Sequence, residues 1–166
     1  MLTIIGCGNA NRGDDAAGVV VAQRLRRKVG AMDLPGVRVF DAGTGGMDVM
    51  FQARGSRSLI VVDASASGSR PGSIFEVPGD EIESAPRPGQ GLHAFRWDNA
   101  LYAGRLIFKE QFPRDVTVYL IEGERFTLGA ELSAPVEAAV DRVVELIVDR
   151  LGEPMAVADP AETEVC

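Results

Sequence analysis

Three side chains in this sequence have the chemistry to bind a divalent metal ion together. Asp15 follows the glycine-rich loop after the first apolar segment, Asp63 ends the third apolar segment, and His93 is the only histidine. Two carboxylates and one imidazole can bind a borderline divalent ion and leave coordination positions open for substrate or water. This set indicates metal-assisted chemistry, provided that the fold brings the three residues together.

Each of these residues also has a structural interpretation. Asp15 could complement the positive end of a helix, and Asp63 could stabilise a turn after a buried strand. A lone histidine such as His93 is more often structural than a metal ligand. Their spacing in the sequence does not show that the three residues meet. Whether they do depends on the order of the helices and strands.

That order favours an α/β fold. Short apolar segments alternate with helical patterns, which predicts a mostly parallel sheet covered by helices on both faces. The expected strands are residues 1–7, 37–40, 58–62, 73–77 and 116–121. The fourth follows the third without a helix between them, so we expect it to be an antiparallel edge strand.

The expected helices are residues 15–29, 47–53 and 92–107, and a last one between Ser133 and Gly152. Gly30 should end the first helix, and Ser133 should cap the last. Residues 79–91 are expected to form a long loop. Residues 1–152 then make a single α/β catalytic domain, and residues 153–166, which show no periodicity, a flexible C-terminal tail.

Open α/β sheets bind ligands at the carboxyl ends of strands, where the winding direction reverses. We expect the first and third strands to meet there, which brings Asp14, Asp15 and Asp63 to one crevice. His93 is expected at the start of a helix, where the helix dipole would keep its imidazole neutral.

Composition excludes several classes of protein. The 17 Lys and Arg residues against 24 Asp and Glu give a net charge of −7, which is a poor match for nucleic acid or an anionic membrane. No apolar run is long enough to span a membrane and no basic leader precedes the first strand, so we expect a cytoplasmic protein. Cys7 and Cys166 are too few for a disulfide framework, and Cys7 is interpreted as a small core residue.

Two other kinds of site are disfavoured. The loop at residues 6–13 (GCGNANRG) suggests dinucleotide binding, but Gly13 comes five residues after Gly8. Asp14 and Asp15 would also repel a pyrophosphate at the start of the helix. The G-x-S-x-G motif of serine hydrolases does not occur.

Several segments, in this order, resemble the nickel–iron hydrogenase maturation endopeptidases. They are residues 6–18 (GCGNANRGDDAAG), 41–47 (DAGTGGM), 61–63 (VVD), His93, and 132–136 (LSAPV). The resemblance extends over about residues 1–151. It implies a three-layer α/β/α sandwich of the phosphorylase/hydrolase-like kind, with a five-stranded, mostly parallel sheet and one antiparallel strand.

The resemblance also implies a function. Members of that family recognise nickel in the precursor of the [NiFe]-hydrogenase large subunit and cleave off its C-terminal extension. By position, Asp15, Asp63 and His93 would be the metal-contacting and catalytic residues. The nickel would come with the precursor, so no permanently bound cofactor is expected. That ion, or a carboxylate acting as base, would activate water.

A second glycine-rich loop, at residues 41–47, has two interpretations. Its backbone amides could contact a bound substrate chain, or it could be a tight turn between strand and helix. We expect substrate-binding residues here: Gly43, Thr44, Gly45 and Gly46.

Two alternative functions remain open. The opening G-x-G-N also resembles the start of peptidyl-tRNA hydrolases, although the net charge of −7 opposes a tRNA substrate. A non-catalytic chaperone could bind nickel or the precursor with the same three ligands.

Overall fold

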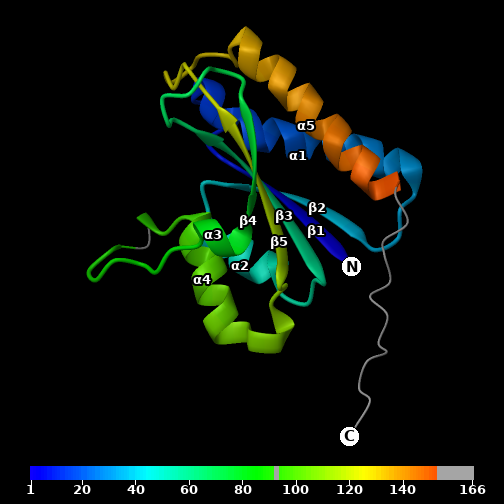
Figure 1. Ribbon diagram of the computed structural model, residues 1–166. Coiled ribbons are helices and arrows are strands. Elements are labelled where there is room, and N and C mark those ends of the chain that lie inside the picture. The colour runs from blue at the N-terminus through cyan, green and yellow to red at the C-terminus, as the bar shows by residue number, and fades with distance from the viewer. Residues whose placement is uncertain (92–93, 153–166) are drawn as a thin grey trace, which may run out of the picture.

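The computed structural model describes residues 1–91 and 94–152, in which helices cover both faces of one five-stranded sheet (Figure 1). The strands are β1 (Leu2–Cys7), β2 (Val37–Gly43), β3 (Ser58–Ser65), β4 (Ile74–Pro78) and β5 (Asp115–Glu122). Their order is β2-β1-β3-β5-β4. All neighbouring pairs are parallel except β4 and β5. The predicted fold class is confirmed, including the antiparallel edge strand.

The helices form one layer on each face of the sheet. α1 (Ala17–Met32) and α5 (Ala134–Gly152) cover one face. α2 (Gly46–Ala53) and α4 (Trp97–Phe108) cover the other, together with the short α3 (Gly79–Ile82). The 3₁₀ turn η1 (Gly13–Ala16) precedes α1, and the 3₁₀ turn η3 (Lys109–Gln111) follows α4.

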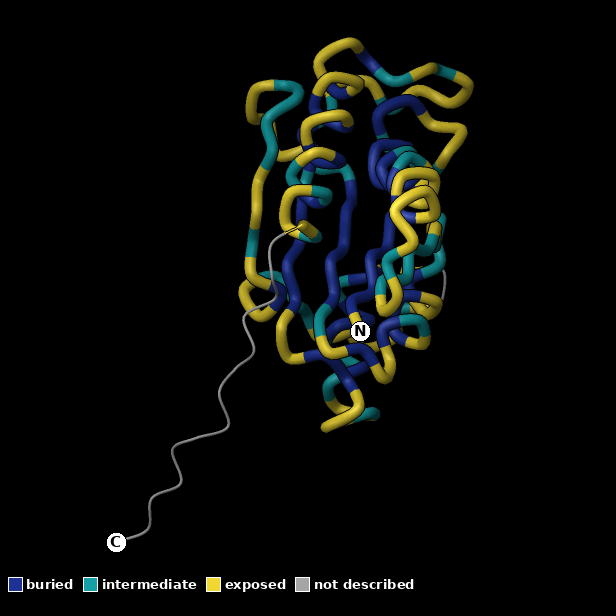
Figure 2. The backbone as a smooth tube through the Cα atoms, turned by 90° about the vertical axis from the view of Figure 1, so that its right-hand side faces the viewer, coloured by how far each residue is buried: buried dark blue, intermediate teal, exposed yellow. Residues whose placement is uncertain are grey.

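The core consists of two apolar layers separated by the sheet. On β1, Ile4 packs toward α1 and α5, whereas Ile5 packs toward α2 and α4. Because neighbouring strand residues face opposite layers, the central strands need apolar residues at nearly every position. Figure 2 shows these strands in dark blue, between helices whose outer turns are exposed.

The first helix differs from its prediction at both ends. Asp14 and Asp15 lie in η1, and α1 begins only at Ala17. Gly30 does not end α1, which continues to Met32. The helix stops at Asp33, whose backbone is left-handed with φ 46°. Glycine is tolerated in a helix at a cost of about 1 kcal/mol, and aspartate is among the few other residues that adopt the left-handed conformation.

α4 begins five residues later than predicted, at Trp97. Arg96 is extended, and its N–H donates to the Asn99 side chain at 3.3 Å, which fixes the start of the helix there. The predicted loop at residues 79–91 also contains α3. Residues 92–93 and 153–166 lie outside the described part of the chain, so the tail at 153–166 stays a prediction. Among the described helices, none is long and apolar enough to cross a membrane.

Candidate active site

The carboxyl ends of β1 and β3 lie side by side at the centre of the sheet. Gly6 of β1 pairs with Val62 of β3, and β2 lies on the other side of β1. The sequence predicted this reversal of winding direction. A cavity of about 340 Å³ opens here and is lined by both candidate aspartates, Asp15 and Asp63.

A close approach between η1 and the end of β1 positions Asp15. Gly8 has φ +128°, and a Cβ atom on it would lie 1.9 Å from the carbonyl oxygen of Asp15. Only glycine allows this approach. The half-buried Asp15 therefore lies at the wall of the cavity.

Asp14 does not share this position, although the sequence predicted that both carboxylates would reach the crevice. It is fully buried, and its carboxylate accepts the N–H groups of Glu124, Arg125 and Ser133 and the Ser133 hydroxyl, at 2.7 to 2.9 Å. Burial raises the pKa of Asp14, but these hydrogen bonds outweigh it and hold the pKa below its usual value. Asp14 therefore anchors the β5–α5 connection to η1.

Asp63 is held at the end of β3 by hydrogen bonds to both carboxylate oxygens. Oδ2 accepts the indole N–H of Trp97 at 2.6 Å and lies 3.4 Å from the Arg96 guanidinium. Oδ1 accepts the N–H of Ala64 at 2.8 Å. The side chain is only 8% exposed, and these contacts fix its orientation toward the cavity wall.

Burial is the main reason that the pKa of Asp63 is raised. The bonds from Trp97 and Ala64 and the charge of Arg96 oppose this, whereas the negative charge of Asp15 adds to it. A cation placed between two neighbouring negative charges is attracted by both. The pair therefore favours a cation at this edge of the sheet.

Sequence reasoning missed Trp97 and Arg96. It placed the start of α4 five residues too early, and so placed both residues inside the helix. One signal was present, because a buried tryptophan usually finds a partner for its indole N–H, and a carboxylate that ends a buried strand is such a partner. Arg96 carried no comparable signal.

The second glycine loop forms another wall of the cavity. Gly46 packs against the backbone of Phe95, where a Cβ atom would lie 2.2 Å from the carbonyl oxygen. The N–H groups of Gly43, Gly45 and Gly46 are hydrogen bonded to Asp41, Ala42 and Thr44. The loop is therefore a tight turn between β2 and α2. Substrate binding by it stays a prediction.

His93, the predicted third ligand, lies outside the described residues. Phe95 and Arg96, which are described and follow it closely in the chain, line the cavity. Among the described residues, no three His, Cys, Asp or Glu side chains form a group that could hold a metal ion. Asp15 and Asp63 thus supply two donors, and a complete set needs a third.

Cys7 is buried at the end of β1 and borders the same cavity. Burial, reinforced by the charge of Asp63, raises the pKa of its thiol well above the usual value. A protonated thiol is a poor nucleophile and a poor metal ligand. This agrees with the interpretation of Cys7 as a small core residue.

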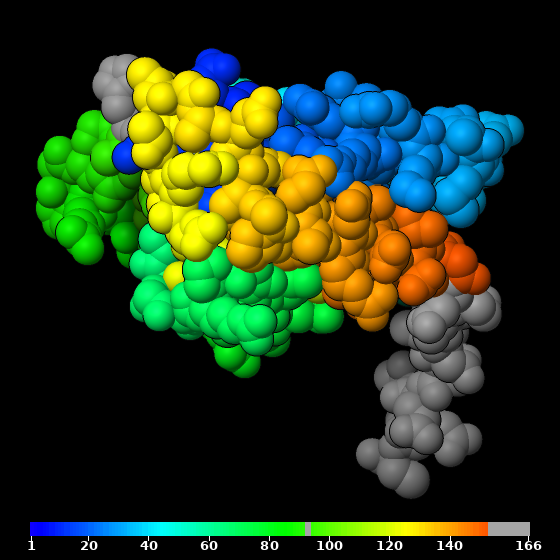
Figure 3. Space-filling model, turned by 90° about the horizontal axis from the view of Figure 1, so that it is seen from above, coloured from blue at the N-terminus to red at the C-terminus, as the bar shows by residue number. Residues whose placement is uncertain are grey.

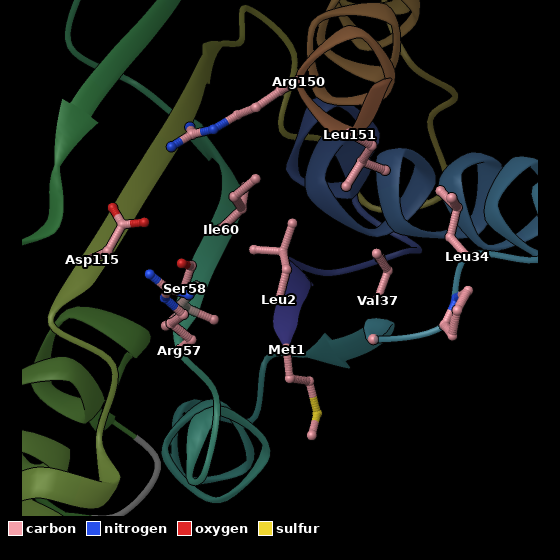
Figure 4. A pocket seen from close by; sticks show the side chains of 13 residues that line it. Met1, Leu2, Leu34, Val37, Arg57, Ser58, Ile60, Asp115, Arg150 and Leu151 are labelled. Carbon is pink, nitrogen blue, oxygen red and sulfur yellow. The ribbon is translucent and has the colours of Figure 1, made fainter. Parts of the chain in front are cut away.

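Another cavity, of about 580 Å³, lies at the opposite edge of the sheet. It surrounds the amino ends of the strands, where Leu2, Val37 and Ser58 line it (Figure 4). Asp15 follows β1 and Asp63 lies near the carboxyl end of β3, so this cavity is separate from the candidate site.

The chain is similar to a known protein family over most of its length. A model described as hydrogenase maturation protease matches residues 19–150. The chain belongs to this family. The match includes the positions of Asp63 and His93 and begins just after Asp15. Because the family consists of proteases, this finding decides against the peptidyl-tRNA hydrolase alternative.

The similarity of this hydrogenase maturation protease to its relatives extends over nearly its whole length. It is 31% identical over 156 residues to a putative hydrogenase maturation protease of Methanocaldococcus jannaschii, covering 90% of this chain and 96% of the relative. It is 26% identical over 162 residues to the hydrogenase 2 maturation protease of Escherichia coli, covering 97% of this chain and 96% of the relative.

Solved structures show the same fold. The E. coli hydrogenase maturating endopeptidase HybD superposes with a TM-score of 0.73 at 24% identity, over 90% of this chain and 91% of that one. The maturation protease HycI of Thermococcus kodakarensis superposes with a TM-score of 0.71 at 23% identity, over 92% of both chains.

Proposed function

We propose that this protease recognises nickel in the precursor of the [NiFe]-hydrogenase large subunit and removes the C-terminal extension of that precursor. The supporting observation is the convergence of Asp15 and Asp63 on one cavity at the carboxyl ends of β1 and β3. The nickel is part of the substrate, and the enzyme needs no resident cofactor.

In this proposal, Asp15 and Asp63 complete the coordination of the client's nickel, with His93 as the third ligand. The buried, hydrogen-bonded Asp63 supplies a fixed oxygen, while the more accessible Asp15 can adjust to the incoming ion. A nickel ion held in this way can polarise the scissile carbonyl or lower the pKa of a bound water. One of the carboxylates could instead serve as the general base.

The donor types also favour release of the product. Two carboxylates and one imidazole bind nickel less strongly than a set containing thiolates. The thiol of Cys7 borders the cavity, but its raised pKa keeps it protonated. The client can therefore keep its nickel after cleavage.

Replacement of His93 by alanine is expected to lower the processing rate by about 100-fold, because the site loses its imidazole. The measurement follows the length of the nickel-loaded precursor on a gel. Nickel-free precursor is the control and should stay uncut by the unaltered enzyme. Unchanged processing by the variant would remove His93 from the site. Binding of the precursor without any shortening by the unaltered protein would instead indicate a chaperone.

A further inference from the structure

A further cavity adjoins the candidate site and is not used by the proposed metal chemistry. Its volume is about 580 Å³, and it shares Asp15, Arg96 and Trp97 with the first cavity. From there it extends between the residues that follow β3 and the loop that contains Phe126. A chain lying in this cavity would therefore lead directly to Asp15.

The wall formed by the residues after β3 is fixed by a buried carboxylate. Glu122, only 1% exposed, accepts hydrogen bonds from the hydroxyls of Ser65 and Ser67 and from the N–H of Gly68, at 2.7 to 2.9 Å. These bonds hold the start of the β3–β4 connection against the end of β5. Figure 3 shows this end of the molecule, with the connection in green beside the yellow β5–α5 loop. The wall is therefore formed before any ligand arrives.

The cavity combines apolar surface with an unpaired polar atom. Ile82, Leu120 and Phe126 contribute apolar side chains. Oδ1 of Asp98, on the same lining, is buried, lies 3.8 Å from Arg96 Nε and accepts no hydrogen bond from the described residues, whereas Oδ2 accepts the Ser84 hydroxyl. A buried acceptor without a donor is costly, so this oxygen favours a ligand that carries an N–H group.

Arg96 supplies the complementary donors. Its guanidinium lies 3.4 Å from Asp63 and 3.8 Å from Asp98, and its side chain is 66% exposed. Charge-assisted hydrogen bonds are normally shorter, at about 2.7 to 2.9 Å. Neither contact therefore uses the five N–H donors fully. A donor group beside an unpaired acceptor matches the C=O and N–H groups of an extended polypeptide.

We propose that this cavity beside the candidate site, which we call the Asp98 groove, binds the precursor's polypeptide beside the scissile bond, with Arg96 and Asp98 contacting its backbone. The inference rests on the proposed function, because the client is the large-subunit precursor. The Asp98 groove thus positions the polypeptide beside the proposed metal site, while Asp15 and Asp63 act on the ion.

Two variants test the Asp98 groove. Ala66→Trp places a large side chain on an exposed position of its lining, and Asp98→Asn keeps the shape of the side chain but removes its charge. Each should raise the KM for nickel-loaded precursor by about tenfold, because Ala66→Trp obstructs the groove and Asp98→Asn replaces a charge-assisted hydrogen bond by a weaker neutral one, and should change kcat by less than twofold. The matched controls are Ala31→Trp and Asp149→Asn, at exposed positions of α1 and α5, which should leave both constants unchanged.

A binding measurement separates this inference from the proposed cleavage. The dissociation constant of the precursor should rise about tenfold in both variants, even if the protein proves to bind without cutting. A photoreactive phenylalanine analogue at position 126, where the lining already has a phenylalanine, should also crosslink to the C-terminal part of the precursor. The proposal would be overturned if both variants kept the wild-type KM and dissociation constant. It would also be overturned if crosslinks formed only to other parts of the precursor.

Discussion

Replacing Asp63 with asparagine is expected to slow processing of the nickel-loaded precursor by about 100-fold or more. The amide has the same size, and its oxygen can still accept the Trp97 indole N–H, while its NH₂ group replaces the oxygen that accepts from the Ala64 N–H. Stability should therefore fall somewhat, but the fold should be kept. What is lost is the negative charge that faces the client's cation.

The measurement is the single-turnover rate of shortening of the precursor, with a thermal melt as a check on folding. Asp115→Asn, at an exposed position at the amino end of β5, is the matched control and should process at the normal rate. A folded Asp63→Asn variant with normal processing would show that the carboxylate is not needed for the reaction.

The neighbouring aspartates Asp14 and Asp15 are expected to give opposite results when each is changed to asparagine. Asp14→Asn places an NH₂ group among four buried donors, so the free energy of unfolding should fall by about 3 kcal/mol. Asp15→Asn should change stability by less than about 1 kcal/mol, because the side chain is half-exposed, but it should greatly slow processing.

Urea unfolding of the two variants checks this difference. Equal stabilities would contradict the anchoring role of Asp14. Acid provides a second test, because the pKa of Asp14 is lower in the folded protein than in the unfolded chain. Its contribution is then complete above an unfolded pKa of about 4 and is lost as the pH falls through the folded value. The difference in stability between the unaltered protein and Asp14→Asn should therefore shrink below about pH 4.

The sequence predicted the parts of the fold that depend on alternation and order. Five apolar segments separated by helical patterns indicate a parallel sheet, and the missing crossover before β4 identifies the antiparallel strand. The same topology placed Asp15 and Asp63 at one edge. These features follow from rules that act over a few residues or on the order of elements.

Contacts between distant segments could not be predicted in this way. Asp14 and Asp15 are equivalent in the sequence, and only the packing of the β5–α5 connection determines which carboxylate is buried. The contact of Trp97 with Asp63 depends on where α4 begins, which is set by the bond from the Arg96 N–H to Asn99. Tertiary packing decided both cases.

The most direct test of the central claim is a crystal of this protein soaked with nickel, or with cadmium as a heavier substitute. We expect an anomalous-scattering peak in the cavity between the Asp15 and Asp63 carboxylates, weakened in the Asp63→Asn variant. A nickel peak elsewhere, with this cavity empty in the unaltered protein, would contradict the assignment of the two carboxylates as the site that receives the client's metal.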